Sequence, residues 1–264
     1  MAGVERSPKD TFITVYGRMP VLEVLQDRSL TVDKVLVAEG SHGESLDRIR
    51  ALARQRGVAV RIATPHRVKV LAGNGKHDQG VLADVVAPRM ELVEDFVQRP
   101  SSGPGGSDVV LVLDGVSNPS NVGMILRTAT AAGVAGVVLP RAGSPGVDPL
   151  VVKASAGVAY RAPILRSRTA ADGVRTLRSA GWRILGLDAD APARLYETDL
   201  PAATAVVLGN ETTGISPEVA ELLDFRVTIP MIGGVESLNV SSAAAVVCFE
   251  LLRRRLADHP NPHR

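Results

Sequence analysis

The sequence predicts a two-domain α/β protein, in which a small N-terminal α/β domain precedes a larger, doubly wound domain with a parallel sheet. The first observation is length, because 264 residues favour about two domains. The second is a set of short, almost wholly apolar runs in the C-terminal half, which are typical of buried parallel strands. The third is that helix-like stretches separate these runs, as in units of strand, helix and strand.

Residues 11–87 account for the small domain. Helix-like runs alternate there with short runs rich in β-branched residues. We expect helices over 19–26 and 43–56, and strands over 34–37, 58–62 and 81–86. Residues 1–10 are expected to form an N-terminal tail.

The periodic pattern stops after residue 87. The run 100–107 reads Pro-Ser-Ser-Gly-Pro-Gly-Gly-Ser, which lacks the apolar side chains that a core needs. We therefore expect a flexible linker over 88–107 between the two domains.

Residues 108–264 account for the second domain. Strands are expected over 109–113, 135–139, 182–187, 204–208 and 225–229, with helices over 123–132 and 173–180. An open sheet of this kind is Rossmann-like, and such sheets bind ligands at the carboxyl ends of their strands. We therefore expect the functional site at that edge.

Charge is nearly balanced over the whole chain. The net charge of +2 does not by itself predict a nucleic-acid partner. The distribution is more informative, since residues 45–70 carry seven basic side chains and one acidic one, Asp47. These basic residues form either a solvated face of a helix and a strand or a face that contacts phosphates. With only 3% aromatic residues, recognition of a folded RNA by shape fits better than a base-stacking platform.

Several functional classes are disfavoured by what the sequence lacks. No apolar stretch approaches the ~18 residues that span a bilayer, and the first residues lack the apolar region of a signal peptide. We therefore expect a cytoplasmic protein with no membrane partner. The single cysteine, Cys248, lies in an apolar helix-like run and is expected to be an inert core thiol. No Cys and His cluster has metal-ligand spacing, so we expect no metal.

Three motifs in the C-terminal half carry the chemistry. They read Asn-Pro-Ser-Asn-Val-Gly-Met-Ile-Leu-Arg over 118–127, Gly-Asn-Glu-Thr-Thr-Gly-Ile-Ser over 209–216, and Ile-Pro-Met-Ile-Gly-Gly-Val-Glu-Ser-Leu-Asn-Val-Ser over 229–241. The second motif fits the phosphate-loop pattern G-x-x-x-x-G-K-[ST] except at Ile215, where the pattern requires Lys. Glu211 inside the loop would also repel phosphates. The sequence thus argues against a nucleotide triphosphatase and suits a ligand with a positive centre.

In this order and spacing, the three motifs resemble those of the SpoU (TrmH-like) branch of the SPOUT RNA 2′-O-ribose methyltransferases. The resemblance covers about residues 108–252. The runs 16–25 and 77–81 resemble the small L30e-like RNA-binding domain of the rRNA-modifying members. The resemblance implies S-adenosylmethionine as cofactor and structured RNA, in particular 23S rRNA, as substrate. It also implies a homodimer and a deep trefoil knot in the C-terminal segment.

The resemblance further implies roles for individual residues. The catalytic positions are Asn121, Arg127, Glu211, Ser237 and Asn239. The cofactor-binding positions, largely through backbone atoms, are Leu208, Gly209, Asn210, Gly214, Ile229, Met231 and Leu238. The RNA-binding positions are Arg18, Arg48, Arg54, His77 and Gln79.

Arg127 and the third motif each have a second interpretation. A guanidinium is protonated at neutral pH and has no acceptor, so Arg127 would orient the ribose hydroxyl and stabilise developing negative charge. Literal deprotonation by Arg127 is an alternative hypothesis, and without the resemblance a lone Arg on a helix reads as a solvated residue. In the third motif, Pro230 ends a strand, and Ser237 or Asn239 is expected to cap the next helix.

Three other functions fit the sequence less well. A tRNA 2′-O-methyltransferase would share the catalytic motifs, but the L30e-like domain favours rRNA. A non-catalytic RNA-binding protein would have a decayed site, whereas the catalytic positions are intact. A dinucleotide-dependent dehydrogenase would need G-x-G-x-x-G after the first strand, and residues 114–119 do not supply it.

Overall fold

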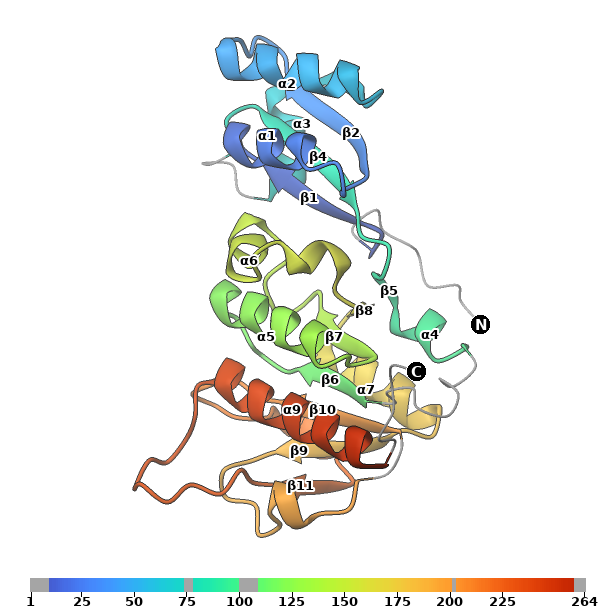
Figure 1. Ribbon diagram of the computed structural model, residues 1–264, viewed down its shortest axis with the longest axis vertical. Coiled ribbons are helices and arrows are strands. Elements are labelled where there is room, and N and C mark those ends of the chain that lie inside the picture. Colours follow the sequence, from blue (N-terminus) through green and yellow to red (C-terminus); the bar gives the residue numbers. More distant parts are fainter. Residues whose placement is uncertain (1–9, 74–77, 100–108, 201–202, 259–264) are drawn as a thin grey trace.

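The computed structural model describes residues 10–73, 78–99, 109–200 and 203–258. A four-stranded sheet organises the N-terminal part and a seven-stranded sheet the C-terminal part, stacked along the long axis of the molecule (Figure 1). The predicted class, a small α/β domain followed by a Rossmann-like parallel sheet, is confirmed. The trefoil knot stays a prediction.

The small domain covers both faces of its sheet with helices. Its elements are β1 (Phe12–Tyr16), α1 (Arg18–Gln26), β2 (Val32–Ala38), α2 (Glu44–Gln55), β3 (Ala59–Ala63), α3 (Pro65–Ala72) and β4 (Val81–Val86). The strand order is β1-β4-β2-β3, with β4 antiparallel to both neighbours and β2 parallel to β3. Helices α1 and α2 pack on one face and α3 on the other. The sequence missed β1 and α3 but predicted the other elements to within about two residues.

The large sheet is parallel throughout. Its strands are β5 (Glu91–Leu92), β6 (Val109–Leu113), β7 (Gly136–Pro140), β8 (Ile164–Ser167), β9 (Arg183–Leu187), β10 (Thr204–Leu208) and β11 (Phe225–Val227). They lie in the order β11-β9-β10-β6-β7-β8-β5. Five of the seven were predicted, although β11 ends two residues earlier than expected. β5 and β8 were missed because neither is long enough to show a clear apolar run.

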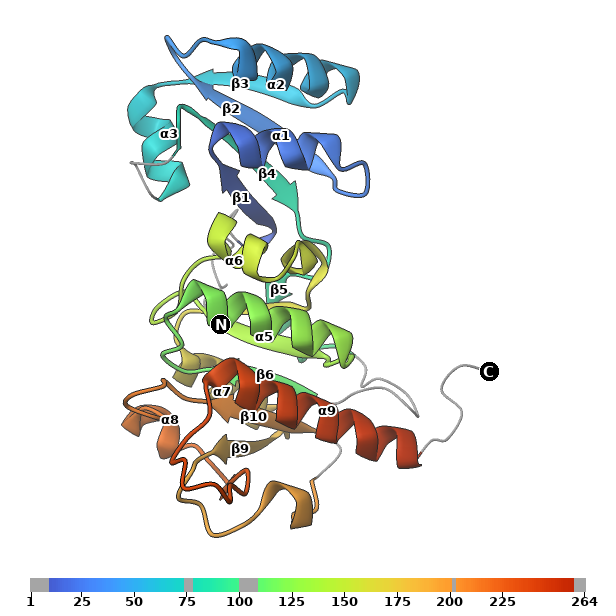
Figure 2. The same ribbon diagram turned by 60° about the vertical axis from the view of Figure 1, so that its left-hand side comes forward.

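Two helical layers cover this sheet. The helices are α4 (Val93–Phe96), α5 (Pro119–Ala131), α6 (Pro149–Ala154), α7 (Ala170–Ser179), α8 (Pro217–Ala220) and α9 (Val240–Asp258), with short 3₁₀ turns η2 (Val158–Arg161) and η3 (Leu195–Glu197). Alternate strand residues face opposite layers: Leu111 packs with α5 and α9, and Val112 with α4, α7 and α8. Figure 2 shows α5 and α9 side by side on the same face.

The expected linker and tail need correction. Residues 88–99 do not form a flexible connection, because β5 pairs with β8, α4 follows, and Met90, Leu92 and Val93 are buried. A two-residue strand has no periodicity that a sequence pattern could reveal. Asp10, assigned to the tail, is also buried. The Pro- and Gly-rich run 100–107 and residues 1–9 lie outside the described residues.

The structure confirms the expectation that Cys248 is a core thiol. It lies in α9 with a side chain that is almost fully buried, and this burial raises the pKa of its thiol to about 12. The reactive thiolate is therefore suppressed at neutral pH. Within the described ranges, no helix is both long and apolar enough to cross a membrane.

Glu250 secures α9 to the segment that precedes β10. Its buried carboxylate accepts hydrogen bonds from Arg253 Nε (2.8 Å) and Arg254 Nε (2.7 Å). Arg254 in turn donates to the carbonyls of Leu195 and Thr198. The hydrogen bond from Arg253 is the largest cause that lowers the pKa of Glu250 from 4.5 to about 2. The folded state therefore favours the ionised carboxylate.

We expect Glu250→Gln to lower the free energy of unfolding by about 2 kcal/mol at pH 7. Because the folded pKa lies below the ordinary value, this stabilisation is present above about pH 4.5 and is lost as the pH falls through about 2. Urea unfolding at pH 7 and pH 3 should show the variant and the wild type converging in acid. Glu197→Gln, which removes an exposed ion pair with Arg194, is the control. A difference that does not change with pH would contradict the prediction.

Candidate active site

The first motif opens α5 at the carboxyl end of β6. Asn118 caps the helix, with its Oδ1 accepting a hydrogen bond from the Ser120 N–H (2.9 Å), and Pro119 takes the first helical position. This start places Asn121 in the first turn, where its residue is only 4% exposed. A polar amide at such a buried position needs partners.

The partners of Asn121 come from the other two motifs. Its Nδ2 donates to Glu211 Oε1 of the second motif, and its Oδ1 accepts from Asn239 Nδ2 of the third (3.2 Å). Asn239 Oδ1 accepts from both the hydroxyl (2.6 Å) and the N–H (2.9 Å) of Ser241. We call this the amide chain: Glu211, Asn121, Asn239 and Ser241. It joins three motifs that are far apart in sequence.

The second motif forms a closed turn after β10. The N–H groups and carbonyls of Asn210 and Gly214 bond reciprocally at 2.9 Å, and Asn210 Oδ1 accepts from the N–H groups of Thr212 and Thr213. A phosphate loop needs such N–H groups for its ligand. Here they are bonded within the turn, so the structure agrees with the argument against a nucleotide triphosphatase.

Gly209 makes this turn possible. A Cβ at this residue would lie 2.4 Å from the carbonyl carbon of Gly214 and 2.5 Å from the nitrogen of Ile215. These are backbone atoms that cannot move aside without opening the turn. Leu208, the last residue of β10, is 1% exposed and anchors the start of the turn in the core.

The sequence missed two residues that hold the turn against β6. Asp114 Oδ2 accepts from the Ser216 N–H at 2.7 Å, and the Gly115 carbonyl accepts from Asn210 Nδ2 at 2.8 Å. Asp114 is only 7% exposed. The available signal was its position, since it is a carboxylate directly after a buried strand, where ligand sites of parallel sheets lie.

The third motif runs over the surface between β11 and α9. Ile229 is nearly buried and Met231 half-buried, whereas residues 232–239 are exposed, including Leu238 at 40%. Asn239 is the predicted cap that the structure confirms, because its side chain accepts the Ser241 N–H. Ser237 is exposed, and its hydroxyl has no hydrogen bond to a described residue.

Arg127 is not joined to the amide chain. It lies six residues after Asn121 on α5, about 9 Å further along the helix by the rise per residue. Its side chain is exposed, and among the described residues it has no hydrogen bond or ion pair. Its catalytic role stays a prediction.

The predicted RNA-binding residues fall into two groups. Arg18 and Gln79 lie together, because Gln79 Oε1 accepts from the Arg18 N–H (3.0 Å) and the Gln79 carbonyl accepts from Arg18 Nε (3.4 Å). Arg48 and Arg54 are exposed on α2, whose start adjoins the Arg18 guanidinium. His77 lies outside the described residues.

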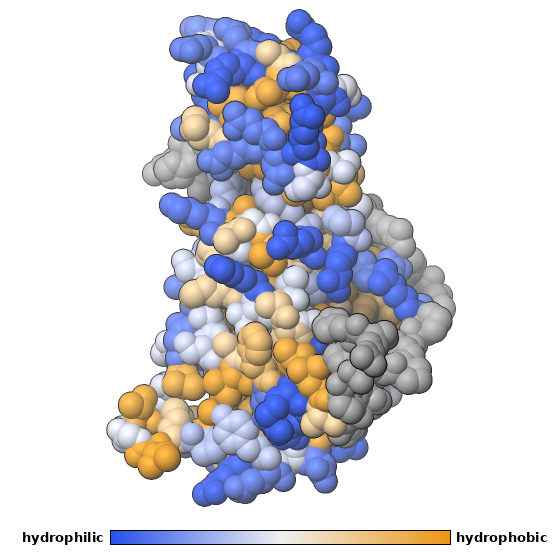
Figure 3. Space-filling model, in the orientation of Figure 1, coloured by the Kyte–Doolittle hydropathy of each residue, from blue (hydrophilic) through white to orange (hydrophobic). Residues whose placement is uncertain are grey.

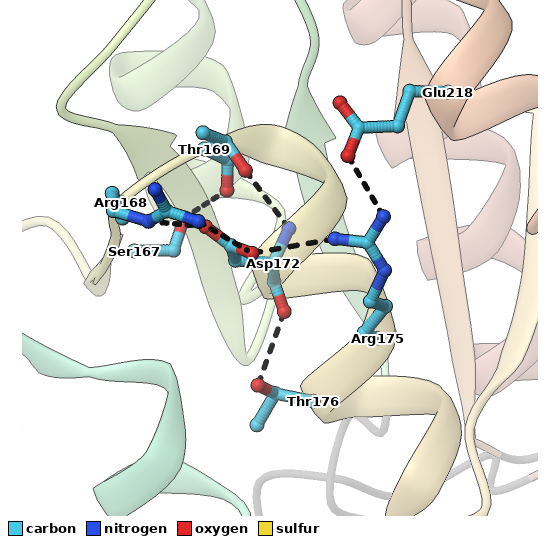
Figure 4. Close-up of polar contacts among 7 residues, drawn as sticks. All are labelled: Ser167, Arg168, Thr169, Asp172, Arg175, Thr176 and Glu218. Atoms are coloured by element: carbon cyan, nitrogen blue, oxygen red, sulfur yellow. Dashed lines mark hydrogen bonds and ion pairs between the residues drawn. The ribbon is translucent and has the colours of Figure 1, made fainter.

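An ion-pair chain supports α8, the helix that begins directly after the second motif. Figure 4 shows Asp172 between Arg168 and Arg175 on the side of α7, with Arg175 reaching across to Glu218 of α8. The contact between Arg175 Nη2 and Glu218 Oε1 is 2.7 Å long. These pairs are exposed, so each contributes little alone. Their effect is to keep α8 beside α7.

The comparisons with known proteins agree with the fold and the motifs. The chain belongs to the SpoU rRNA methylase family, whose model matches residues 108–249. A second model, described as RNA 2′-O ribose methyltransferase substrate binding, matches residues 14–91. The resemblance found in the sequence is therefore confirmed for both domains.

Individual relatives and solved structures within this family are similar to the chain over almost its whole length. The chain is 38% identical to the 23S rRNA (guanosine-2′-O-)-methyltransferase RlmB of Xylella fastidiosa, over 91% of this chain and 96% of that protein. A solved structure from Porphyromonas gingivalis, a putative RNA methyltransferase of the TrmH family, has a TM-score of 0.60 and 31% identity, covering 93% and 91% of the two chains. The SpoU methyltransferase AviRb of Streptomyces viridochromogenes, in complex with the cofactor AdoMet, has a TM-score of 0.61 and 25% identity, covering 94% and 92%.

The turn around Gly209 gives a direct test of the cofactor site. Gly209→Ala is expected to weaken S-adenosylmethionine binding at least ~10-fold, because the added Cβ must open the turn. Isothermal titration calorimetry measures this. Gly146→Ala is a matched control, since a Cβ there meets nothing within 4 Å. Unchanged cofactor affinity in Gly209→Ala would argue that the turn does not form the binding site.

The amide chain gives a second test. Asn121→Ala removes both the donor to Glu211 and the acceptor for Asn239, so we expect methyl transfer to fall by about 10². Single-turnover rates with saturating cofactor and RNA measure the effect on the chemical step. Ser120→Ala, an exposed neighbour on the same helix, should retain the wild-type rate. A rate for Asn121→Ala close to that of the control would exclude the amide chain from catalysis.

Proposed function

We propose that the protein transfers a methyl group from S-adenosylmethionine to the ribose 2′-hydroxyl of a nucleotide in 23S rRNA. The observation that carries this proposal is the amide chain, which joins the three methylase motifs at the carboxyl edge of the parallel sheet. The names of the curated relatives support 23S rRNA as substrate and a guanosine as its target.

The chemistry of the site suits this cofactor. Gly209 lets the second motif close into its turn, and we propose that this turn presents backbone groups to the cofactor. The exposed Glu211 provides a negative charge for a sulfonium cation. Ile229 and Leu238 supply apolar surface against which an adenine can lie. We propose that these residues, with Leu208, Asn210, Gly214 and Met231, hold the cofactor.

S-adenosylmethionine supplies an already activated methyl group, so the protein's own work is positioning. We propose that Asn121 and Asn239 fix the carboxylate of Glu211, which forms the wall of the site with Ser237. Arg127 orients the ribose hydroxyl and stabilises the negative charge that develops on its oxygen. With the cofactor bound, the ribose oxygen would form its bond to the methyl group as the sulfur–methyl bond breaks, the neutral thioether would leave as product, and the proton of the hydroxyl would pass to solvent.

The small domain is proposed to bind the RNA. Arg18 and Gln79 lie together beside the start of α2, and Arg48 and Arg54 are exposed on that helix. Phosphate contacts of this kind add affinity without reading sequence. Arg56 is not part of this surface, because it donates to the carbonyls of Val24, Leu25, Asp27 and Leu30 and so holds the end of α1.

We also propose that the protein forms a homodimer and acts in the cytoplasm. Figure 3 shows apolar side chains gathered over the lower half of one face, where α9 crosses the sheet. Phe249 is 51% exposed and Leu256 41% exposed on that helix. An apolar patch of this kind on a helix suits an interface with a second copy. The relatives named 23S rRNA methyltransferases match over both domains, which favours rRNA over tRNA as substrate.

The function is tested by transfer of a tritiated methyl group to total RNA from a strain that lacks the gene, followed by mapping of the label. We expect label on one ribose of 23S rRNA. Label on tRNA would instead support the tRNA alternative, and no label despite demonstrated cofactor binding would support a binding protein without catalysis.

Arg127→Lys tests the role of the guanidinium in the same assay. The variant keeps the charge but loses the planar donor fork, so we expect the rate to fall by about 10². Arg183→Lys is the matched control, because Arg183 lies at the amino end of β9, at the opposite edge of the sheet. Near-normal methylation by Arg127→Lys would contradict both proposed roles of Arg127.

A further inference from the structure

The two domains meet at an ion pair between a buried carboxylate and a partly exposed guanidinium. Asp10, two residues before β1, is 5% exposed, and its carboxylate accepts from the Nε (3.2 Å) and Nη2 of Arg141. Arg141 directly follows β7 of the catalytic sheet. Two parallel hydrogen bonds between a guanidinium and a carboxylate fix both the distance and the angle between the groups.

The backbone on the catalytic side of this pair is held in place. The Arg141 N–H donates to the Ser167 carbonyl at the end of β8 (2.9 Å). One residue earlier on β8, Arg166 is 6% exposed and donates through Nη1 to the Leu139 carbonyl (2.7 Å). Asp10 therefore contacts a residue whose backbone is hydrogen-bonded to the end of β8.

Asp10 compensates the charge of Arg166 as well as that of Arg141. The Nε of Arg166 is buried without a partner among the described residues, and this residue lines a cavity of about 100 Å³ between the domains. Burial lowers the pKa of Arg166 to about 10, while Asp10 opposes that shift and Arg141 adds to it. Asp10 thus offsets the charge of two neighbouring guanidinium groups. Without it, two positive charges would face each other at the domain boundary.

Tyr160 marks a second place where charged groups of the small domain lie near the catalytic domain. Tyr160 of η2 is 7% exposed, and its pKa is raised by burial and then by the charges of Glu23 on α1 and of Asp27, which follows that helix. In Figures 1 and 2, α6 and the adjoining turn lie directly beneath the small domain. The small domain therefore adjoins this part of the catalytic domain as well as Arg141.

The ion pair also lies close to the proposed active site. A Cβ at Gly143, two residues after Arg141, would lie 4.0 Å from the Cα of Gly115. Gly115 in turn accepts the hydrogen bond from Asn210 of the second motif. The small domain is therefore attached at the edge of the sheet where the three motifs meet.

We propose that Asp10, Arg141 and Arg166 are positioning residues that hold the RNA-binding domain at a set distance and angle from the active site. This inference rests on the proposed function. An RNA bound to the small domain then places one ribose at the active site. The ion pair thereby determines which nucleotide of the RNA is methylated. The three residues do not touch the reacting atoms.

The test uses Asp10→Asn, Arg141→Gln and the exchanged pair Asp10→Arg with Arg141→Asp in the full chain. With a 23S rRNA fragment as substrate, we expect the single variants to raise the KM for RNA about 10-fold, with unchanged affinity for S-adenosylmethionine. We also expect mapping to show label spread to neighbouring riboses. The exchanged pair restores the ionic contact, so it should recover most of the wild-type KM. Glu197→Gln, which breaks an exposed ion pair away from the boundary, is the control.

A second measurement does not depend on methylation. Small-angle X-ray scattering of Asp10→Asn should show a larger radius of gyration than the wild type or Glu197→Gln, because the domains are released. If the wild type methylates no RNA, the proposed function fails while scattering still tests the ion pair. Unchanged scattering together with an unchanged KM would overturn the inference. A variant that loses cofactor binding is taken to have lost its fold. In that case Arg141→Lys, which keeps the charge but lacks the planar guanidinium, replaces it in the scattering experiment. A radius of gyration equal to that of the wild type, together with an unchanged KM, would then overturn the inference.

Discussion

The amide of Asn121 is the interaction on which the candidate active site depends. Its nitrogen can only donate and its oxygen can only accept, so its two contacts require an acceptor on one side and a donor on the other. Glu211 and Asn239 meet these requirements from two other motifs. Because Asn121 is buried, leaving either contact unmade would be costly, and the three motifs are therefore held together.

The parallel sheet brings these motifs to one place. The strands β6 and β10 are neighbours, so the residues after their carboxyl ends meet even though about 95 residues separate them in the chain. Asp114 and Gly115 use this adjacency to hold the turn of the second motif. α9 packs against α5 and so returns the third motif to the same edge. The site is a property of the sheet edge and not of any one loop.

The small domain enters this arrangement through the domain boundary. Asp10 was expected in an N-terminal tail and β5 in a linker, yet Asp10 pairs with Arg141 and β5 extends the large sheet. An RNA methylase that grips its substrate with one domain and reacts with another needs a defined geometry between them. We propose that the contact between Asp10 and Arg141 supplies it.

The sequence by itself determined the fold class, the predicted strands and the three motifs, because apolar periodicity and local turn chemistry are written in consecutive residues. It also predicted Ser237 or Asn239 as a helix cap, of which the structure shows Asn239, and Cys248 as a core thiol. Only the tertiary structure decided that Asn121 joins Glu211 to Asn239, that Asp114 holds the second motif, and that Asp10 faces Arg141. These contacts depend on strand order and domain packing, which bring together residues about 90 to 130 positions apart. No local pattern encodes such pairs.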